Sequence, residues 1–227
     1  MRAYLRQLAD RRRARRDRVG RRIDTPEERR LSRRYELWTD HGILRRLWTN
    51  FAEIAPGVFR SNHPHPARLE AYAARGIRAV LNLRGTGQRA PYLFEAEACA
   101  ALGLQLISVD LQARKAAPPD QLLALFDAFD RIDRPFVMHC KSGADRAGLA
   151  SALYLLDTGA SVAEARRMLS LRYLHLRFTR TGVQDHMLDI YEDRLRRGPI
   201  GIRDWVRDEY DPDALTQSFA AKRIIPV

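Results

Sequence analysis

The spacing of hydrophobic residues changes near residue 54 of the chain. Beyond this point, short apolar runs alternate with segments in which apolar residues recur at helical spacing. The pattern predicts strands over 58–60, 77–84, 106–109 and 136–139, and helices over 69–75, 92–102, 118–132, 144–156, 161–169 and 183–195. Because strands and helices alternate, we expect an α/β fold with a central, mainly parallel sheet of about four to five strands, flanked by helices.

The preceding segment, 36–55, carries apolar residues at close to helical spacing on one face. These residues are Leu37, Trp38, Ile43, Leu44, Leu47, Trp48 and Phe51. We expect this face to pack on the core of the protein. The alternative is contact with a membrane interface through the two tryptophans, which lie close to Arg45 and Arg46.

Positive charge is concentrated at the N-terminal end. The 227 residues carry a formal net charge of +12. Residues 1–50 hold sixteen arginines and seven acidic residues, which accounts for +9 of this charge. The centre of the excess is the run 11–16. We expect a solvent-exposed basic arm, and the alternative is an arm attracted to anionic lipid, nucleic acid or an acidic protein.

Several protein classes are disfavoured by the remaining composition. Two cysteines do not make a disulfide scaffold and suit a reduced compartment. There is no apolar run of transmembrane length and no signal-peptide core, so we expect a cytoplasmic location, with peripheral membrane association as the alternative. His63, His65 and His175 do not show metal-ligand spacing, so neither a metal nor a cofactor is expected.

Residues 139–148 read His-Cys-Lys-Ser-Gly-Ala-Asp-Arg-Ala-Gly and directly follow an apolar run. Cys140 falls at the end of a predicted strand, and Arg146 falls just inside the next helix. A short loop that opens a helix can turn its N–H groups toward a tetrahedral anion, and a guanidinium can bind two oxygens of that anion. The helix N-terminus and Arg146 both favour the nucleophilic thiolate of Cys140. Gly148 would let this helix pack closely on a neighbouring strand.

This segment resembles the signature loop of the cysteine-dependent phosphatases, which comprise protein tyrosine phosphatases, dual-specificity phosphatases and their lipid-phosphatase relatives. Residues 57–61 and 76–84 also resemble the opening of small dual-specificity-type phosphatases, including bacterial ones. The resemblance implies a tyrosine-phosphatase-like fold. We therefore divide the chain into a basic N-terminal helical arm (1–50), a phosphatase-like catalytic domain (51–200) and a C-terminal extension that packs on it (201–227).

The resemblance further implies the roles of individual residues. Cys140 would take up the phosphoryl group, Arg146 would bind the phosphate, and His139 would hold the loop and help to poise the sulfur. Phosphate binding would fall to the loop residues Lys141, Ser142, Gly143, Ala144, Asp145 and Arg146. A carboxylic acid is also needed, first to protonate the leaving oxygen and then to act as a base for water.

Two aspartates compete for the role of this acid. Asp110 ends the strand that precedes the signature strand, as the general acid of dual-specificity phosphatases does. Asp145 lies inside the loop, as in some lipid-active and bacterial members of the superfamily. Asp110 is slightly favoured. The structural alternatives are a turn residue for Asp110 and a salt bridge that orients a neighbouring loop for Asp145.

Ala147 departs from the family pattern, which usually has a serine or threonine directly after the arginine. That hydroxyl helps the sulfur to leave in the second step. The sequence predicts a cysteine-dependent phosphatase acting on phosphotyrosine or phosphoserine/threonine in proteins. One alternative is a lipid or inositol phosphate phosphatase whose arm contacts an anionic membrane. Another is a weakly catalytic phosphate-binding module, and nucleic acid is not the partner we favour.

Overall fold

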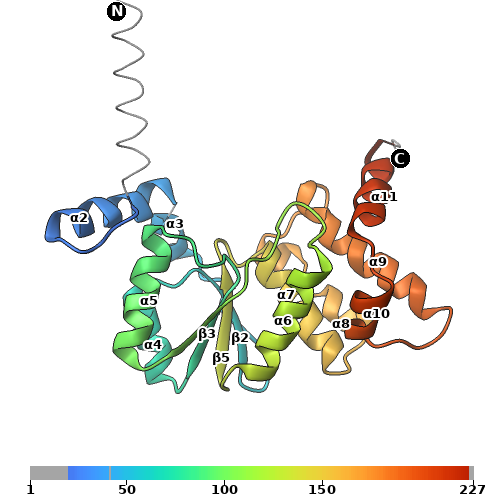
Figure 1. Cartoon of the computed structure of the whole chain (residues 1–227), viewed down its shortest axis with the longest axis horizontal. Helices are drawn as coiled ribbons and strands as arrows, with labels where there is room; N and C mark the ends of the chain where they lie inside the picture. Colours follow the sequence, from blue (N-terminus) through green and yellow to red (C-terminus); the bar gives the residue numbers. More distant parts are fainter. Residues whose placement is uncertain (1–19, 41, 225–227) are drawn as a thin grey trace, which may run out of the picture.

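A mixed sheet of five strands lies between two layers of helices in the computed structural model, which describes residues 20–40 and 42–224 (Figure 1). The strand order is β1-β2-β5-β3-β4. Strand β1 is antiparallel to β2, and all other neighbours are parallel. The strands are β1 Ala52–Ala55, β2 Val58–Asn62, β3 Ala79–Asn82, β4 Gln105–Ser108 and β5 Phe136–Cys140. The predicted fold class is therefore confirmed.

Helices α4 and α5 cover one face of the sheet, and α6 and α7 cover the other (Figure 1). The helices from β2 onward are α4 Pro66–Ala74, α5 Ala90–Leu102, α6 Pro119–Arg131, α7 Asp145–Asp157, α8 Val162–Arg166, α9 Val183–Leu195, α10 Ile202–Asp208 and α11 Pro212–Ile224. Successive side chains of a strand point to opposite faces. In β5, Phe136 and Met138 join the apolar cluster under α6 and α7, whereas Val137 joins the cluster under α4 and α5. A strand buried on both faces explains the unbroken apolar run in the sequence.

The segment before the sheet differs from the expected helix over 36–55. It contains helix α2 Pro26–Arg34, a π-helical turn η1 Tyr35–Thr39 and helix α3 Gly42–Leu47, after which residues 52–55 pair as the edge strand β1. The expected core packing of this face is wrong for four large side chains, which are exposed: Trp38, Ile43, Leu47 and Trp48. Phe51 does pack, because it stacks on Phe59 and Tyr72 at centroid distances of 5.3 and 5.0 Å.

The C-terminal helices pack on this core. Helix α10 contacts α6 and α7, and α11 contacts α9. Arg203 of α10 pairs with Asp130 of α6 and Asp157 of α7 at 2.6 and 2.5 Å. Within residues 20–40 and 42–224, no helix combines the length and apolar character that crossing a bilayer requires. The run 11–16, which we predicted as the centre of a basic arm, lies outside the described residues.

Candidate active site

The predicted signature loop leaves the central strand of the sheet. Strand β5 lies between β2 and β3, and its last residue, Cys140, pairs with Asn62 at the end of β2. The helices that follow β3 and β5 cover opposite faces of the sheet (Figure 1). A crevice forms where connections diverge in this way, and ligands of open α/β sheets bind in such crevices. The topology thus places the loop at a natural binding position.

A cavity of about 590 Å³ opens over Cys140. Its walls come from five separate regions of the chain. The lining residues are Asp40, Arg45, Trp48, Asn62, Ala113, Arg114, Cys140, Lys141, Ser142, Asp145, Arg146 and Leu174. Cationic side chains outnumber carboxylates in this wall, which suits an anionic ligand. The structure therefore brings the predicted Cys140, Lys141, Ser142, Asp145 and Arg146 to one cavity.

The bend of the loop depends on Gly143 and Arg60. Gly143 has φ +74°, and a Cβ there would lie 2.7 Å from the backbone nitrogen of Asn62. The buried guanidinium of Arg60 donates to the carbonyls of Gly143 at 2.6 Å and Ala144 at 3.2 Å. Because the C=O and N–H of a trans peptide point in opposite directions, the N–H of Asp145 is turned away from Arg60. Burial lowers the pKa of Arg60 to about 10, so the side chain still carries its charge at neutral pH.

The N-terminus of α7 has no side-chain cap. The first N–H groups of such a helix lack an intrahelical partner and form an anion-binding site together with the helix dipole. Gly148 lies one turn into this helix, where a Cβ would come within 2.8 Å of Leu169 Cδ2 and 2.9 Å of the Met168 carbonyl. The tightest neighbour is thus the segment after α8, and the guanidinium of Arg60 from strand β2 lies slightly farther away, at 3.6 Å. An uncapped helix end beside a cysteine can stabilise both thiolate and phosphate.

Arg146 extends from α7 across the crevice, and its Nη1 donates to the carbonyl of Leu83 at 3.3 Å. Leu83 directly follows β3, so this contact joins the ends of the two neighbouring strands. The four other N–H groups of the guanidinium form no hydrogen bond with the described residues, so an anion in the cavity can accept from them. Arg146 is therefore in position to bind the oxygens of a phosphate.

Asp145 belongs to a chain of three titratable side chains. Its Oδ1 lies 2.9 Å from Nδ1 of the buried His175, whose Nε2 lies 2.7 Å from Oδ2 of Asp185. Burial alone would lower the pKa of His175, but the hydrogen bonds to both aspartates raise it to about 9. The protonated imidazole thus donates to both carboxylates and fixes the direction of the Asp145 side chain at the cavity wall.

Asp110, the other candidate acid, is exposed and does not belong to the described residues that line the cavity. Its backbone bridges that of Arg84, and its side chain lies against Gly85, since a Cβ on that glycine would meet Asp110 Cβ at 2.9 Å. The structure therefore separates the two candidate acids. Asp145 shares the cavity with Cys140, whereas Asp110 lies in the turn beside Arg84.

A third aspartate, Asp40, enters the cavity from the segment between η1 and α3. It accepts from Arg84 at 3.0 Å and Arg45 at 2.5 Å, and Lys141 Nζ lies 3.3 Å from its Oδ1. Burial would raise the pKa of Asp40, but the charges of Arg84 and Arg45 hold it below its usual value. Asp40 is therefore an anion that contacts the cations of Arg84, Arg45 and Lys141 at the edge of the cavity.

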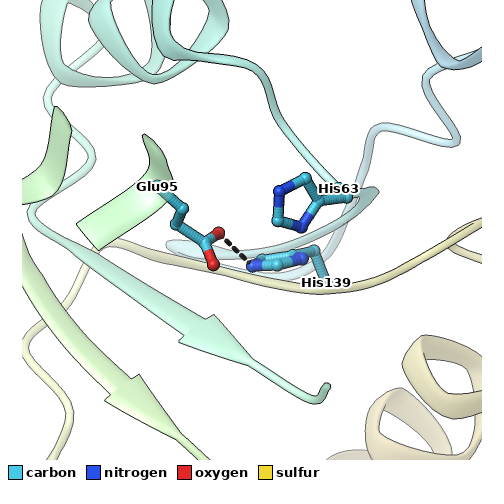
Figure 2. Close-up of side chains that lie close together, drawn as sticks. All are labelled: His63, Glu95 and His139. Carbon is cyan, nitrogen blue, oxygen red and sulfur yellow. Dashed lines mark ion pairs between the residues drawn. The ribbon is translucent and has the colours of Figure 1, made fainter. Parts of the chain in front are cut away.

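His139 does not belong to the described residues that line the cavity and lies in a buried cluster with Glu95 of α5 and His63, which follows β2 (Figure 2). His139 Nε2 forms an ion pair with Glu95 Oε1 at 2.5 Å. The ring of His63 lies edge-on to that of His139 at 4.9 Å, and His63 Nε2 lies 3.2 Å from the carbonyl of Pro91. The carboxylate of Glu95 thus holds the buried imidazole of His139, which directly precedes Cys140 in the chain.

The same three side chains could hold a divalent metal ion, because their ligand atoms all lie within 4.8 Å of one another. Apart from the ion pair, both nitrogens of His139, both oxygens of Glu95 and Nδ1 of His63 have no hydrogen-bond partner among the described residues. The absence of a metal stays a prediction.

Four residues of this site escaped the sequence analysis in their structural roles: Asn50, Arg60, Asp40 and His175. Asn50 donates to the carbonyls of Ser142 and Tyr173, both at 2.9 Å, and thereby ties the loop to residues beyond α8. None of the four lies within a recognisable motif for its role. Only Arg60 could have been noticed in the sequence, because it is a charged residue in an apolar segment that predicts a strand.

Comparisons with known proteins agree with this geometry. Residues 56–160 match the family model described as "Polymorphic toxin system, DSP-PTPase phosphatase". This span contains strands β2 to β5, the signature loop and α7. A search of curated proteins finds no significant match to the sequence.

Solved structures share the fold. A DUF442 protein from Shewanella putrefaciens CN-32 is 15% identical, with 67% of this chain and 95% of that chain covered and a TM-score of 0.54. The active form of Tk-PTP is 23% identical, with 65% of this chain and 99% of that chain covered and a TM-score of 0.51. At these identities the likeness shows that the arrangement of strands and helices is the same.

Proposed function

We propose that this chain, which is a phosphatase of the dual-specificity and protein tyrosine phosphatase superfamily, hydrolyses phosphate monoesters through a phosphocysteine on Cys140. One observation carries the proposal: Cys140 lies in a cationic cavity of about 590 Å³ together with Arg146, at the uncapped N-terminus of α7. The thiolate attacks phosphorus, the ester oxygen leaves with a proton, and water then cleaves the S–P bond. Arg146 and the amides of the loop stabilise the charge that develops on the phosphoryl oxygens.

Trapping of the phosphoenzyme tests this proposal. The protein is mixed with an aryl phosphate, denatured rapidly in acid and weighed by mass spectrometry. We expect one added phosphoryl group in the unmodified protein and none in Cys140→Ser. Cys99→Ala is the matched control, because Cys99 is buried in the core and should not affect labelling. Labelling that survives in Cys140→Ser would refute the proposed nucleophile.

We further propose Asp145 as the general acid, contrary to the slight sequence-based preference for Asp110. The position of Asp145 in the cavity wall beside Cys140 supports this choice, and its contact with His175 orients the side chain. General acid catalysis typically contributes about 10²–10⁴-fold, and most of it is lost when the substrate has a good leaving group. Asp145→Asn should therefore lower the rate on an alkyl phosphate more than about tenfold while affecting a nitrophenyl phosphate far less. If Asp110→Asn showed this loss and Asp145→Asn did not, Asp110 would be the general acid.

Two substrate classes fit the cavity. Phosphorylated protein side chains are the class that the sequence favours. A lipid or inositol phosphate is the second class, and the cations gathered around Asp40 at the rim support it, since they could bind additional phosphates. Turnover numbers on phosphopeptides and on inositol phosphates distinguish the two. No turnover of either, together with retained phosphate binding, would leave a binding module, as the missing hydroxyl at Ala147 suggested.

A further inference from the structure

The exposed large hydrophobic side chains are not scattered over the surface. Within residues 20–40 and 42–224, all of them except Ile190 fall in two segments, 38–48 and 171–178. They are Trp38, Ile43, Leu47, Trp48, Leu171, Leu174, Leu176 and Phe178. Leu47 is 88% exposed and Phe178 is 73% exposed. Single exposed hydrophobic residues are common, but a concentration of this kind marks an interaction surface.

Both segments border the catalytic cavity. Trp48 of the first segment and Leu174 of the second line it. The side chain of Asn50 connects the two regions, since it donates to the carbonyls of Ser142 and Tyr173. We name as the apolar rim the exposed residues adjoining these contacts: Leu47, Trp48, Leu171, Leu174, Leu176 and Phe178. Trp48, Leu174 and Leu176 of this rim lie next to the site, because Leu176 lines a neighbouring cavity together with Leu174 and Asp145.

The second segment is held rigidly in this exposed position. Tyr173 and His175 are buried and anchor it, the former 3.7 Å from the guanidinium of Arg60 and the latter between two aspartates. Between these anchors Leu174 adopts φ +61°, a left-handed conformation that disfavours a leucine. Its side chain is 53% exposed, so packing gives little compensation. An unfavourable residue kept at the mouth of a cavity points to a functional demand.

Exposed cations lie in or just after the second segment, and also on the loop after β4, where Arg114 lines the cavity together with Leu174. They are Arg114, Lys115, Arg172, Arg177 and Arg180. None of the five forms an ion pair with an acidic residue in the part of the chain that the structure describes. Tryptophan, leucine and phenylalanine side chains beside unpaired arginines compose a face that enters the headgroup layer of a bilayer. The positive charge is complementary to anionic lipid.

We infer that the apolar rim docks the protein on an anionic lipid bilayer and presents the Cys140 cavity to the phosphate monoester of a lipid headgroup. The assignment of a lipid substrate rests on the proposed function, whereas docking requires no turnover. The two parts can therefore fail separately. The inference also accounts for the exposure of Leu47 and Trp48, which the sequence led us to place in the core.

Co-sedimentation of the full chain with vesicles tests the docking. The vesicles are phosphatidylcholine alone or phosphatidylcholine with phosphatidylserine. We expect binding to the anionic vesicles and a loss of about tenfold or more in Leu47→Ser/Phe178→Ser and in Arg177→Gln/Arg180→Gln. Ile190→Ser is the matched apolar control. Arg78→Gln is the matched charge control, because Arg78 precedes β3 at the opposite end of the sheet. Equal losses in variants and controls, or no binding, would overturn the docking surface.

Tryptophan fluorescence separates the rim from the basic run 11–16, which could itself attract anionic vesicles. The chain has three tryptophans, and Trp205 is buried, so Trp38→Phe leaves Trp48 as the exposed reporter. We expect a blue shift on anionic vesicles and quenching by brominated acyl chains. Co-sedimentation without either signal would mean that residues outside the rim bind the membrane, and the inference would be wrong.

Activity distinguishes failure of docking from failure of the proposed function. On a soluble aryl phosphate, Leu47→Ser/Phe178→Ser should retain kcat/KM, because neither residue lines the cavity. On a phosphatidylinositol monophosphate in anionic vesicles the same variant should lose about tenfold or more. Vesicle binding without turnover of any ester would refute the proposed function alone. A variant that loses activity on phosphopeptides but binds vesicles normally would identify a protein as the partner and refute lipid docking.

Discussion

Replacement of His175 by glutamine removes the cation that lies between Asp145 and Asp185. The imidazole is fully buried and its pKa is raised from 6.5 to about 9 by the hydrogen bonds to the two carboxylates, against the effect of burial. One pKa unit corresponds to about 1.4 kcal/mol, so the protonated form contributes about 3 kcal/mol to the free energy of unfolding. Because the folded pKa is raised, this contribution is complete below about pH 6.5 and is lost as the pH rises through about 9.

Urea unfolding at a series of pH values measures this contribution. The difference in unfolding free energy between the unmodified protein and His175→Gln should fall by about 3 kcal/mol from pH 6.5 to above pH 9. Other groups that titrate in this range cancel in the difference. His186→Gln is the matched control: burial lowers the pKa of His186, so its contribution should change only below about pH 6.5. A His175 difference that is flat across the upper range would refute a charged His175.

Three further outcomes follow from the contacts of the site and the core. Arg60→Lys keeps a charge but loses the planar fork that holds the loop carbonyls, so kcat/KM on an aryl phosphate should fall by at least about tenfold; unchanged kinetics would contradict the positioning role. Ala147→Ser should restore the hydroxyl usual in the family and reduce the phosphoenzyme that accumulates in rapid-quench experiments, and equal accumulation would count against slow S–P cleavage. Arg203→Gln should destabilise the protein by about 0.5–2 kcal/mol in urea unfolding, because it breaks two partly exposed carboxylate pairs between α10 and the core; an unchanged midpoint would show these pairs to be inert.

The sequence alone predicted the fold class and the strand-loop-helix arrangement around Cys140 well, because both depend on local patterns. The apolar run 136–138 and the helix that follows the loop are visible in neighbouring residues. A loop that ends a strand and opens a helix needs few distant partners to form an anion site. The boundaries of α9, Val183–Leu195, were also predicted correctly from periodicity.

Only the tertiary structure could show which distant residues complete the site. Arg60 reaches a carbonyl 83 positions away, and His175 reaches Asp145 over 30 positions. Such pairs leave no periodic signal, since each residue taken alone resembles an ordinary surface or strand residue. The same limit misled the interpretation of 36–55. Helical spacing indicates that one face is apolar, but only the packing of the whole chain decides whether that face meets the core or lies exposed beside the cavity.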